Sequence, residues 1–384
     1  MTTNSTFSLS EEQELFRKSV REFAEDRIAP RAADIDEADE FPWDLHKALV
    51  EQGFMGVGFS EEFGGSGGGP LDVCILAEEI SRVSAGVSLI QLVNRLGALP
   101  ILIAGTDEQK KAASAGISSG EHQYSYCLTE PGAGSDAAAM ASKAVKDGDG
   151  WRITGTKRFI TNAGISDRYV YFAVSDPNGD KGKNITAFII DKDTEGFSIG
   201  KSEKKMGIRG SPTCEVLCDG VWVSDEAVIG EVHQGFQVAM KTLDYSRPTI
   251  AAQALGIAQG ALDYAVGYTK EREQFGQPIA RFEGVQFMLA DMAMAIEASR
   301  LLTYKSALMA AEGHPRVGYF AAIAKAFASD TAMRVTTDAV QLLGGYGYVK
   351  EFPVERMMRD AKITQIYEGT NQIQRVVIGR GLLK

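Results

Sequence analysis

Three short segments of the sequence carry residues whose types and spacing could support chemistry. The segment 367–371 places the carboxylate of Glu368 directly before a Gly-Thr-Asn turn. A carboxylate is a candidate acid or base, although a lone glutamate is usually a solvated surface residue. The segment 126–136 ends a predicted strand in a Pro-Gly-Ala-Gly-Ser turn, where small residues let backbone N–H groups approach an anion or a planar ring. Gly344, Gly345 and Gly347 form a second glycine cluster, which indicates close approach of the backbone to another molecule.

Several other chemistries lack the residues that they require. The segment 126–136 has no third glycine of the dinucleotide fingerprint, and the glycine-rich stretch 64–69 is not followed by Gly-Lys-Ser/Thr. Cys214 and Cys218 lie four residues apart without a histidine or a second cysteine pair nearby, so we expect no metal site. There is no Gly-x-Ser-x-Gly nucleophile elbow. The sequence therefore does not fit a nicotinamide Rossmann enzyme, a P-loop protein or a zinc enzyme.

Three zones of different residue pattern must position these segments. Residues 1–120 have apolar residues at helical spacing and predict an N-terminal helical domain. Residues 121–232 have runs of β-branched and aromatic residues separated by turns, which predict a middle domain of strands. Residues 233–384 return to long helices and predict a C-terminal bundle. The predicted fold class is α+β with several domains, and the lack of helices between the strands predicts an antiparallel barrel or sandwich.

Within these zones the pattern also predicts individual elements. The strands are expected at 123–129, 151–160, 169–175, 185–191 and 214–223. A capping box of Ser8 and Glu11 is expected to start the first helix, and helices are expected at 71–83 and 285–302. In the last of these, one face of a bundle helix is formed by Val285, Met288, Leu289, Met292, Ile296, Leu301 and Leu302.

Composition and charge restrict the partners and the compartment. With 40 Lys+Arg against 51 Asp+Glu, the 384-residue chain has a net charge of −11, which opposes a broad nucleic-acid surface. Four cysteines are too few for a disulfide scaffold and fit a reducing compartment. We find no signal peptide at the start and no uncharged apolar run of about eighteen residues. We therefore expect a soluble, cytoplasmic protein that binds neither nucleic acid nor membrane.

Seven segments taken together resemble the acyl-CoA dehydrogenase family, and they follow one another in the family's order and spacing along nearly the whole chain. They are 126–136, 157–162, 206–213, 244–248, 272–276, 341–347 and 367–375. The resemblance implies an N-terminal helical domain, a middle antiparallel β-barrel and a C-terminal four-helix bundle. This agrees with the three zones of the sequence.

The resemblance also implies an activity. Such enzymes use FAD to convert an acyl-CoA thioester into the trans-2-enoyl-CoA, as in fatty acid β-oxidation, and they pass the electrons to an electron-transfer flavoprotein. Glu368 matches the catalytic base that removes the α-proton. Some relatives carry the base directly before the arginine that corresponds to Arg247, but Ser246 occupies that position and cannot serve. No metal is implied.

The binding residues implied by the resemblance fall into three sets. One lines the flavin: Tyr126, Leu128, Thr129, Gly134, Ser135, Phe159, Ile160 and Thr161, with Thr370 and Gln372 at the ADP portion. A second reaches the FAD of a neighbouring subunit, so that a homo-oligomer, a tetramer, is implied: Arg272, Gln274, Phe275, Gln341, Leu342, Gly344 and Gly345. A third faces the substrate: Ser135, Asp244, Arg247, Tyr367, Gly369 and Arg380. The chain departs from many members at Phe159, where they have tryptophan.

Three alternatives remain open on the sequence. The same chemistry could act on an acyl carrier protein thioester, because it presents the same phosphopantetheine arm as CoA. An acyl-CoA oxidase would let O₂ reoxidise the flavin. A DNA-binding relative of the fold needs a basic surface, which a charge of −11 does not offer. For the acyl chain we expect a short or branched group, enclosed by the region 92–103 and the helix after Arg247.

Overall fold

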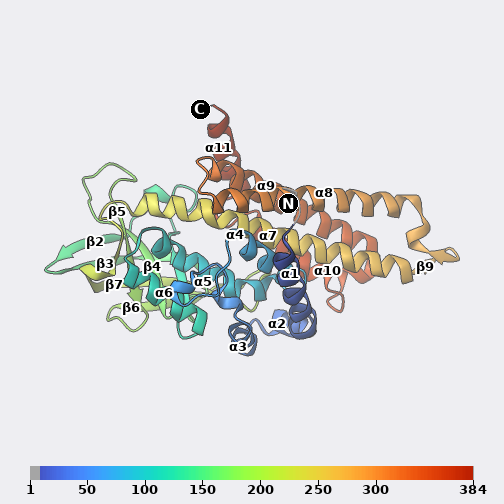
Figure 1. The fold of residues 1–384 in the computed structure, drawn as a ribbon, viewed down its shortest axis with the longest axis horizontal. Helices are drawn as coiled ribbons and strands as arrows, with labels where there is room; N and C mark the ends of the chain where they lie inside the picture. The colour runs from blue at the N-terminus through green and yellow to red at the C-terminus, as the bar shows by residue number, and fades with distance from the viewer. Residues whose placement is uncertain (1–8, 384) are drawn as a thin grey trace.

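A computed structural model describes residues 9–383. Helices form the first part of the chain, and in Figure 1 they lie below α7, with α2 and α3 at the lower edge. Their bounds are α1 Glu11–Phe23, α2 Ala32–Ala38, α3 Trp43–Glu51, α4 Pro70–Ser81, α5 Ala85–Ala104 and α6 Asp107–Ser119. Ser8 lies outside the described residues. Helix α1 begins after Ser10, whose hydroxyl accepts from the Gln13 N–H while the Gln13 side chain accepts from the Ser10 N–H.

The middle of the chain forms one mixed sheet. Its strands are β1 Tyr124–Cys127, β2 Lys143–Asp147, β3 Gly150–Thr161, β4 Arg168–Val174, β5 Ile185–Asp191, β6 Phe197–Ser202, β7 Thr213–Ser224 and β8 Val228–Ile229. The hydrogen-bonded order is β6-β7-β3-β2-β4-β5-β8, with β1 beside β4. Most pairs are antiparallel, but β4 runs parallel to both β1 and β2, which corrects the prediction of a purely antiparallel sheet. Closure into a barrel stays a prediction, because this path does not join its two ends.

Long helices form the rest of the chain. They are α7 Gly235–Glu271, α8 Glu283–Ala311, α9 Val317–Leu343, α10 Val354–Thr364 and α11 Asn371–Leu382, and the short hairpin β9 Glu273–Gln274 and β10 Gln277–Pro278 joins α7 to α8. Helix α7 runs from the sheet at one end of the molecule to this hairpin at the other (Figure 1). The three-domain order of helices, mixed sheet and helices is therefore confirmed at this level.

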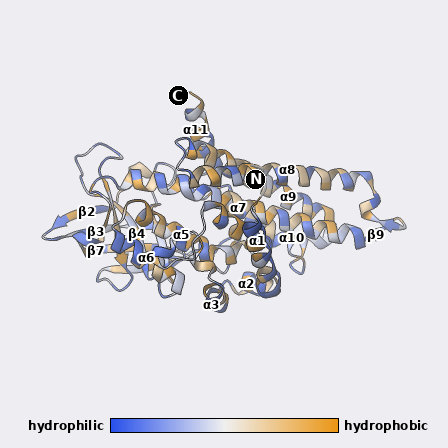
Figure 2. Ribbon diagram, in the orientation of Figure 1, coloured by the Kyte–Doolittle hydropathy of each residue, from blue (hydrophilic) through white to orange (hydrophobic). Residues whose placement is uncertain are grey.

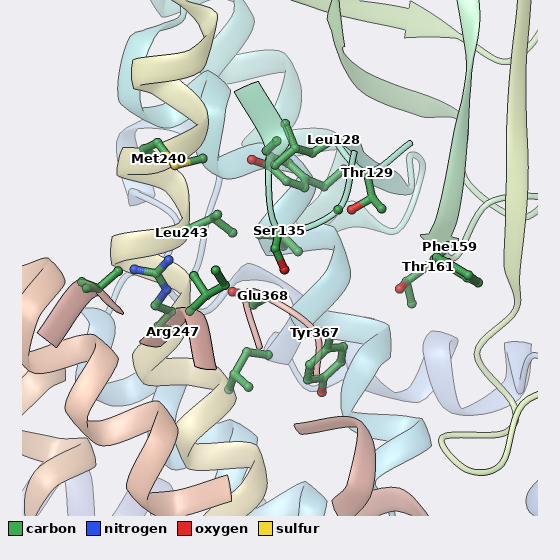
Figure 3. A pocket seen from close by; sticks show the side chains of 18 of the residues that line it. Leu128, Thr129, Ser135, Phe159, Thr161, Met240, Leu243, Arg247, Tyr367 and Glu368 are labelled. Carbon is green, nitrogen blue, oxygen red and sulfur yellow. The ribbon is translucent and has the colours of Figure 1, made fainter. Parts of the chain in front are cut away.

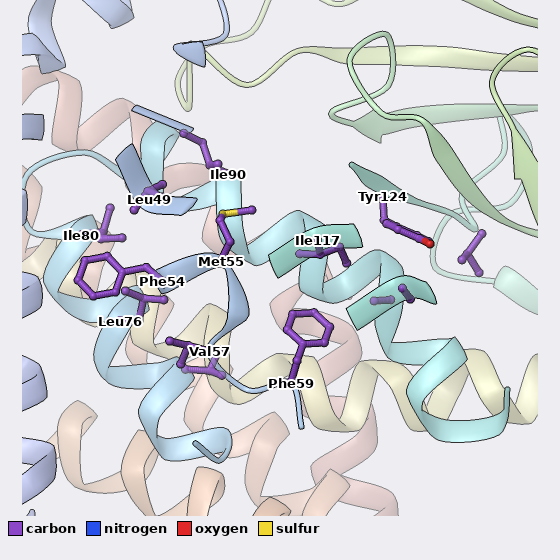
Figure 4. Packing of buried hydrophobic residues seen from close by; sticks show 14 of the residues in the cluster. Leu49, Phe54, Met55, Val57, Phe59, Leu76, Ile80, Ile90, Ile117 and Tyr124 are labelled. Carbon is purple, nitrogen blue, oxygen red and sulfur yellow. The ribbon is translucent and has the colours of Figure 1, made fainter. Parts of the chain in front are cut away.

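The hydrophobic cores cross the borders between the three zones. One cluster joins the first helices to β1 and β4, and Figure 4 shows its side chains packing between Leu49 and Tyr124. A second joins α4 and α5 to the C-terminal helices, along which hydrophobic residues recur in Figure 2. Helix α5 is long and apolar enough to cross a membrane, but 78% of its most apolar window is buried inside the protein, as expected of a core helix. The exact domain limits stay a prediction.

One residue of the predicted α8 face points elsewhere. Met292 and Ile296 are buried in the second core, and Val285, Met288, Leu289 and Leu302 pack against it. Leu301 is 52% exposed, so its assignment to the core face was wrong. The reason is the helical period: residues 301 and 302 are about 100° apart on a helix, and Leu302 takes the inward position.

Candidate active site

A cavity of about 600 Å³, called the central cavity below, lies where the sheet meets the helices. Helices α5 and α7, the segment after β1, the end of β3 and one face of α11 form its walls (Figure 3). Many residues that the sequence singled out line it together: Tyr126, Leu128, Thr129, Gly134, Ser135, Phe159, Ile160, Thr161, Arg247, Tyr367, Glu368, Gly369 and Arg380. The fold thus brings segments that are up to 254 positions apart, at 126 and 380, to one place.

Glu368 sits on a turn between α10 and α11 whose backbone is strained. Its φ is 52° and that of Gly369 is 91°, both in the left-handed region that a glutamate rarely adopts. The turn is held through its carbonyl oxygens: the Gln374 amide donates to Glu368 O at 3.2 Å and to Gly369 O at 2.8 Å. The Lys325 ammonium also donates to Gly369 O, at 2.8 Å. The strained conformation directs the Glu368 side chain into the cavity (Figure 3).

The Glu368 carboxylate lies deep in the molecule but is reached from the cavity. The Ser246 hydroxyl donates a hydrogen bond to its Oε2. Burial raises the pKa of Glu368 to about 7, although the Ser246 bond and the positive charges of Arg247 and Lys325 act in the opposite direction. A carboxyl group with a pKa near neutrality is both available and sufficiently basic to accept a proton from carbon.

Arg247 is a buried cationic group of the cavity wall, which Arg380 also lines. It is buried on α7, one turn after Asp244, and its Nη1 donates to Asp244 Oδ1 at 2.8 Å. Burial lowers the pKa of Arg247, and burial also raises the pKa of Asp244 against the effect of the arginine. Arg247 Nε is buried and finds no hydrogen-bond partner among residues 9–383. Asp244 does not line the cavity itself, and its contact with the substrate stays a prediction.

Phe159 occupies a β-bulge at the cavity mouth. The pairing of β3 with β7 shifts register between Lys157 and Ile160, and Phe159 within the bulge has φ 58°. Its side chain is 58% exposed, and the Arg158 guanidinium lies 5.2 Å from the ring centroid. The bulge therefore turns an aromatic face outward from a strand whose neighbouring Lys157 is fully buried.

The loop after β1 is tied down by a buried ion pair. Lys157 Nζ lies 2.7 Å from Glu130 Oε1, and Glu130 also accepts from the N–H groups of Ala141 at 2.5 Å and Ser142 at 3.0 Å. This fixes the ends of the loop that carries Thr129 and Ser135.

The chemistry of the central cavity suits a flavin. Its walls are mainly apolar, and an aromatic side chain stands at its mouth. The hydroxyls of Thr129, Ser135 and Thr161 make no hydrogen bond to another residue within the described chain, so they can donate to or accept from a ligand. An apolar slot with a few convergent polar groups is the usual form of a site for a planar, polar-edged cofactor.

The residues implied to contact a neighbouring subunit lie elsewhere. Most of them line a second groove of about 490 Å³ at the far end of the bundle, called the bundle-end groove: Arg272, Gln274, Gln341, Leu342, Gly344 and Gly345. Phe275, on the β9-β10 hairpin, is 94% exposed with φ 56°. A Cβ added at Gly344 or Gly345 would meet nothing within 4 Å, so the backbone there is open to a ligand. Their role stays a prediction.

Two residues at the start of α11 are also placed apart from the cavity. The Thr370 hydroxyl caps α11 by accepting from the Ile373 N–H at 3.3 Å. Gln372 is exposed on the surface of that helix. Neither lines the central cavity, and their contact with the ADP portion stays a prediction.

Sequence patterns missed a group of buried polar residues around the cavity. The Tyr367 hydroxyl donates to Gln253 Oε1, and Gln253 Nε2 donates to Ser88 Oγ at 3.0 Å and to Ala85 O at 3.3 Å. The cavity-lining residues end at Leu89 on α5 and at Ile250 on α7, and these bonds lie directly beyond them, since Ser88 precedes Leu89 and Gln253 follows Ile250 by three residues. A single glutamine or lysine within a helix gives no sequence signal of such a role.

Comparison with known proteins covers the chain almost completely. Models of the acyl-CoA dehydrogenase N-terminal, middle and C-terminal domains match residues 10–121, 125–221 and 233–383. The probable acyl-CoA dehydrogenase fadE25 of Mycobacterium leprae is 53% identical over 98% of this chain and 97% of its own length. Butyryl-CoA dehydrogenase from Megasphaera elsdenii superposes with a TM-score of 0.96 at 44% identity over 99% of this chain and all of the other. A chain solved in work on the electron transferring flavoprotein of Acidaminococcus fermentans gives a TM-score of 0.96 at 47% identity, with 99% and 100% coverage.

Proposed function

Because the chain belongs to the acyl-CoA dehydrogenase family, we propose that Glu368 is the base that removes the α-proton of its substrate. The chain is an FAD-dependent acyl-CoA dehydrogenase, and the comparisons favour neither an oxidase, nor a carrier-protein thioester as substrate, nor a DNA-binding protein. The observation that carries the proposal is the carboxylate of Glu368 at the wall of a largely apolar cavity, with its pKa raised to about 7.

Different residues of the central cavity have different proposed roles. Apolar side chains of α5 and α7, such as Leu92, Met240 and Leu243, exclude water from the reacting carbons. Ser246 holds Glu368 Oε2, which leaves Oε1 to take the proton. Thr129, Ser135, Thr161 and Phe159 would hold the flavin. FAD, when bound, accepts the hydride from the β-carbon.

The closed end of the cavity supports a short acyl chain. The bonds from Tyr367 through Gln253 to Ser88 join α5 and α7 directly beyond Leu89 and Ile250, where the cavity lining on these helices ends, and we infer that they limit the length of the acyl group. The name of the butyryl-CoA dehydrogenase reported above gives its substrate as a four-carbon acyl thioester. We therefore place the preferred acyl group among short chains.

Association into a homotetramer is part of the same proposal. Four apolar residues seven positions apart on α8, called the α8 stripe, are exposed by 39–64%: Phe287, Met294, Leu301 and Leu308. A seven-residue repeat keeps them on one face, as in helices that pack against another helix. We propose that a second copy of this chain packs on the α8 stripe, because the implied cofactor site is shared between subunits.

A cytoplasmic location is supported by four cysteines that are all buried and free.

The Glu368→Gln variant tests the role of the base. Glutamine keeps the shape of the side chain but cannot accept the proton, so an acyl-CoA should still bind and perturb the flavin spectrum while flavin reduction slows by about 10²–10⁴-fold. Anaerobic stopped flow with butyryl-CoA measures both. Glu312→Gln, an exposed change at the end of α8, is the matched control and should reduce at the wild-type rate. Reduction of the Glu368→Gln protein at near wild-type speed would overturn the proposal.

A further inference from the structure

Lys325 is a buried cation that the proposed reaction does not use directly. It lies on α9 with no exposed surface, and its ammonium donates to Gly369 O at 2.8 Å and to Asn371 Oδ1 at 3.0 Å. No carboxylate within residues 9–383 lies within 4.0 Å of its nitrogen. A buried charge without an ion pair is costly for the fold, so its presence calls for a compensating role.

The acceptors of Lys325 belong to the turn that carries Glu368. Gly369 O is the carbonyl of the residue directly after the proposed base, and it ends the left-handed pair Glu368–Gly369. Asn371 is the first residue of α11, and its amide donates to Asp330 Oδ1 at 2.7 Å and to Ser329 Oγ at 2.9 Å. Before the turn, the Gln365 amide also donates to Asp330 Oδ1, at 2.7 Å. One face of α9 therefore fixes both ends of the turn, and Lys325 is the group of that face that reaches the left-handed pair.

The charged groups around Lys325 come from each neighbouring segment. Glu368 and Arg247, from the turn and from α7, act on it in opposite directions, and Asp330 lies on α9 itself, paired with Arg375 of α11 at 2.8 Å. Burial lowers the pKa of Lys325 to about 7, while the charge of Glu368 raises it. In return, the lysine favours the ionised form of Glu368.

We propose that Lys325 is a positioning residue for the base: it holds the Glu368–Gly369 turn in its left-handed conformation and stabilises the carboxylate form of Glu368. The inference rests on the proposed role of Glu368. It predicts that the lysine acts on proton abstraction and on its pH dependence, and only weakly on substrate affinity.

The test compares Lys325→Met with Lys325→Arg and Lys305→Met in the purified flavoprotein. In Lys325→Met we expect kcat to fall by about tenfold to a hundredfold, because a small displacement of a catalytic group has an effect of that order. We expect KM to change by less than about threefold, and the rising limb of kcat against pH to move to higher pH. Lys325→Arg keeps the charge and should return the limb to its wild-type position. Lys305 is exposed on α8, and its ammonium lies 4.5 Å from the centroid of the Phe320 ring. The control Lys305→Met should therefore have the wild-type kcat, KM and pH profile.

The outcomes separate this inference from the proposed function. If folded Lys325→Met keeps the wild-type limb and kcat, or if it loses only thermal stability, the inference is overturned. If Lys325→Met does not fold, Lys325→Gln, which keeps an N–H donor without the charge, takes its place, and an unshifted limb overturns the inference. Glu368→Gln is measured in parallel: rapid flavin reduction in that variant would reject the proposed function itself, whatever Lys325 does.

Discussion

Ser246 is the hydroxyl that contacts the proposed base directly. In the sequence it counts only as a position that lacks a carboxylate, whereas in the structure it donates directly to Glu368 Oε2. A hydrogen bond to the charged form lowers a carboxyl pKa, so Ser246→Ala should raise the pKa of Glu368 above its value of about 7. The base must be ionised, and the rising limb of kcat should therefore move to higher pH by up to about one unit. A pH profile of kcat measures the shift, and a limb at the same or lower pH would contradict the interpretation.

A second proposal at the residue scale is that Gln253 limits the length of the cavity. Gln253→Ala removes the middle of the bonds that join Tyr367 to Ser88 and should open the channel by several atoms. We expect the ratio of kcat/KM for octanoyl-CoA to that for butyryl-CoA to rise by about tenfold, within the range that one or more methylenes contribute. A steady-state panel from butyryl-CoA to palmitoyl-CoA measures this. Gln237→Ala, exposed on the same helix, is the control, and an unchanged ratio in Gln253→Ala would show that other residues close the cavity.

The candidate site was predictable only where its residues belong to local motifs. Glu368 stands in a motif, Tyr-Glu-Gly-Thr-Asn, and so could be singled out. The residues that support it come from distant helices: Lys325 is 44 positions away from Gly369, and Gln253 is 114 positions away from Tyr367. Such pairs leave no local pattern, because a lysine or a glutamine within a helix is ordinary wherever it faces solvent.

At the scale of elements, the bulge in β3 decides what the Phe159 position can accept. The side chain packs little against the rest of the chain and tryptophan keeps an aromatic face, so Phe159→Trp should keep the fold and the FAD content. We expect the free energy of unfolding to change by less than about 1 kcal/mol, below the usual effect of overpacking, because the site is open. Visible spectra and turnover with the electron-transfer flavoprotein should change instead. Loss of flavin from this variant would show that the site is built around phenylalanine.

The sequence predicts the strands that contain many apolar residues and misses those that are mostly exposed or very short. The five expected strands correspond to β1, β3, β4, β5 and β7. The pattern missed β2, whose residues are mostly exposed and charged, and also β6 and the two-residue β8. The bulge at Phe159 could not be predicted, since a left-handed phenylalanine opposes local preference and is imposed by the pairing with β7.

At the scale of the whole molecule, the α8 stripe should control assembly. Leu301→Glu places a charge on an exposed apolar row and should dissociate the proposed tetramer. Because Arg272 and Gln341 are implied to reach the FAD of a neighbour, the flavin content should fall together with the oligomer. Light scattering coupled to absorbance at the flavin band measures both.

The control for assembly is a similar change on a distant helix. Leu15→Glu, on the exposed side of α1, introduces the same charge and should leave the mass of the assembly and the FAD content unchanged. A stable Leu301→Glu monomer with full flavin occupancy would contradict the shared cofactor site.

The order of the three zones could be predicted from the sequence, but the arrangement that packs α4 and α5 against the C-terminal helices could not, since it depends on contacts between distant segments.

The left-handed backbone at Phe159, Phe275 and Glu368 has a consequence for protein engineering. These three are among seven non-glycine residues with positive φ in residues 9–383, and each such conformation costs about 1–3 kcal/mol. Glycine at these positions would relieve the strain, so a library selected only for heat resistance would be drawn toward them. At Glu368 such a selection would yield a protein that is more stable to heat but has lost its proposed base. Thermal screens of this enzyme therefore need a simultaneous selection for turnover.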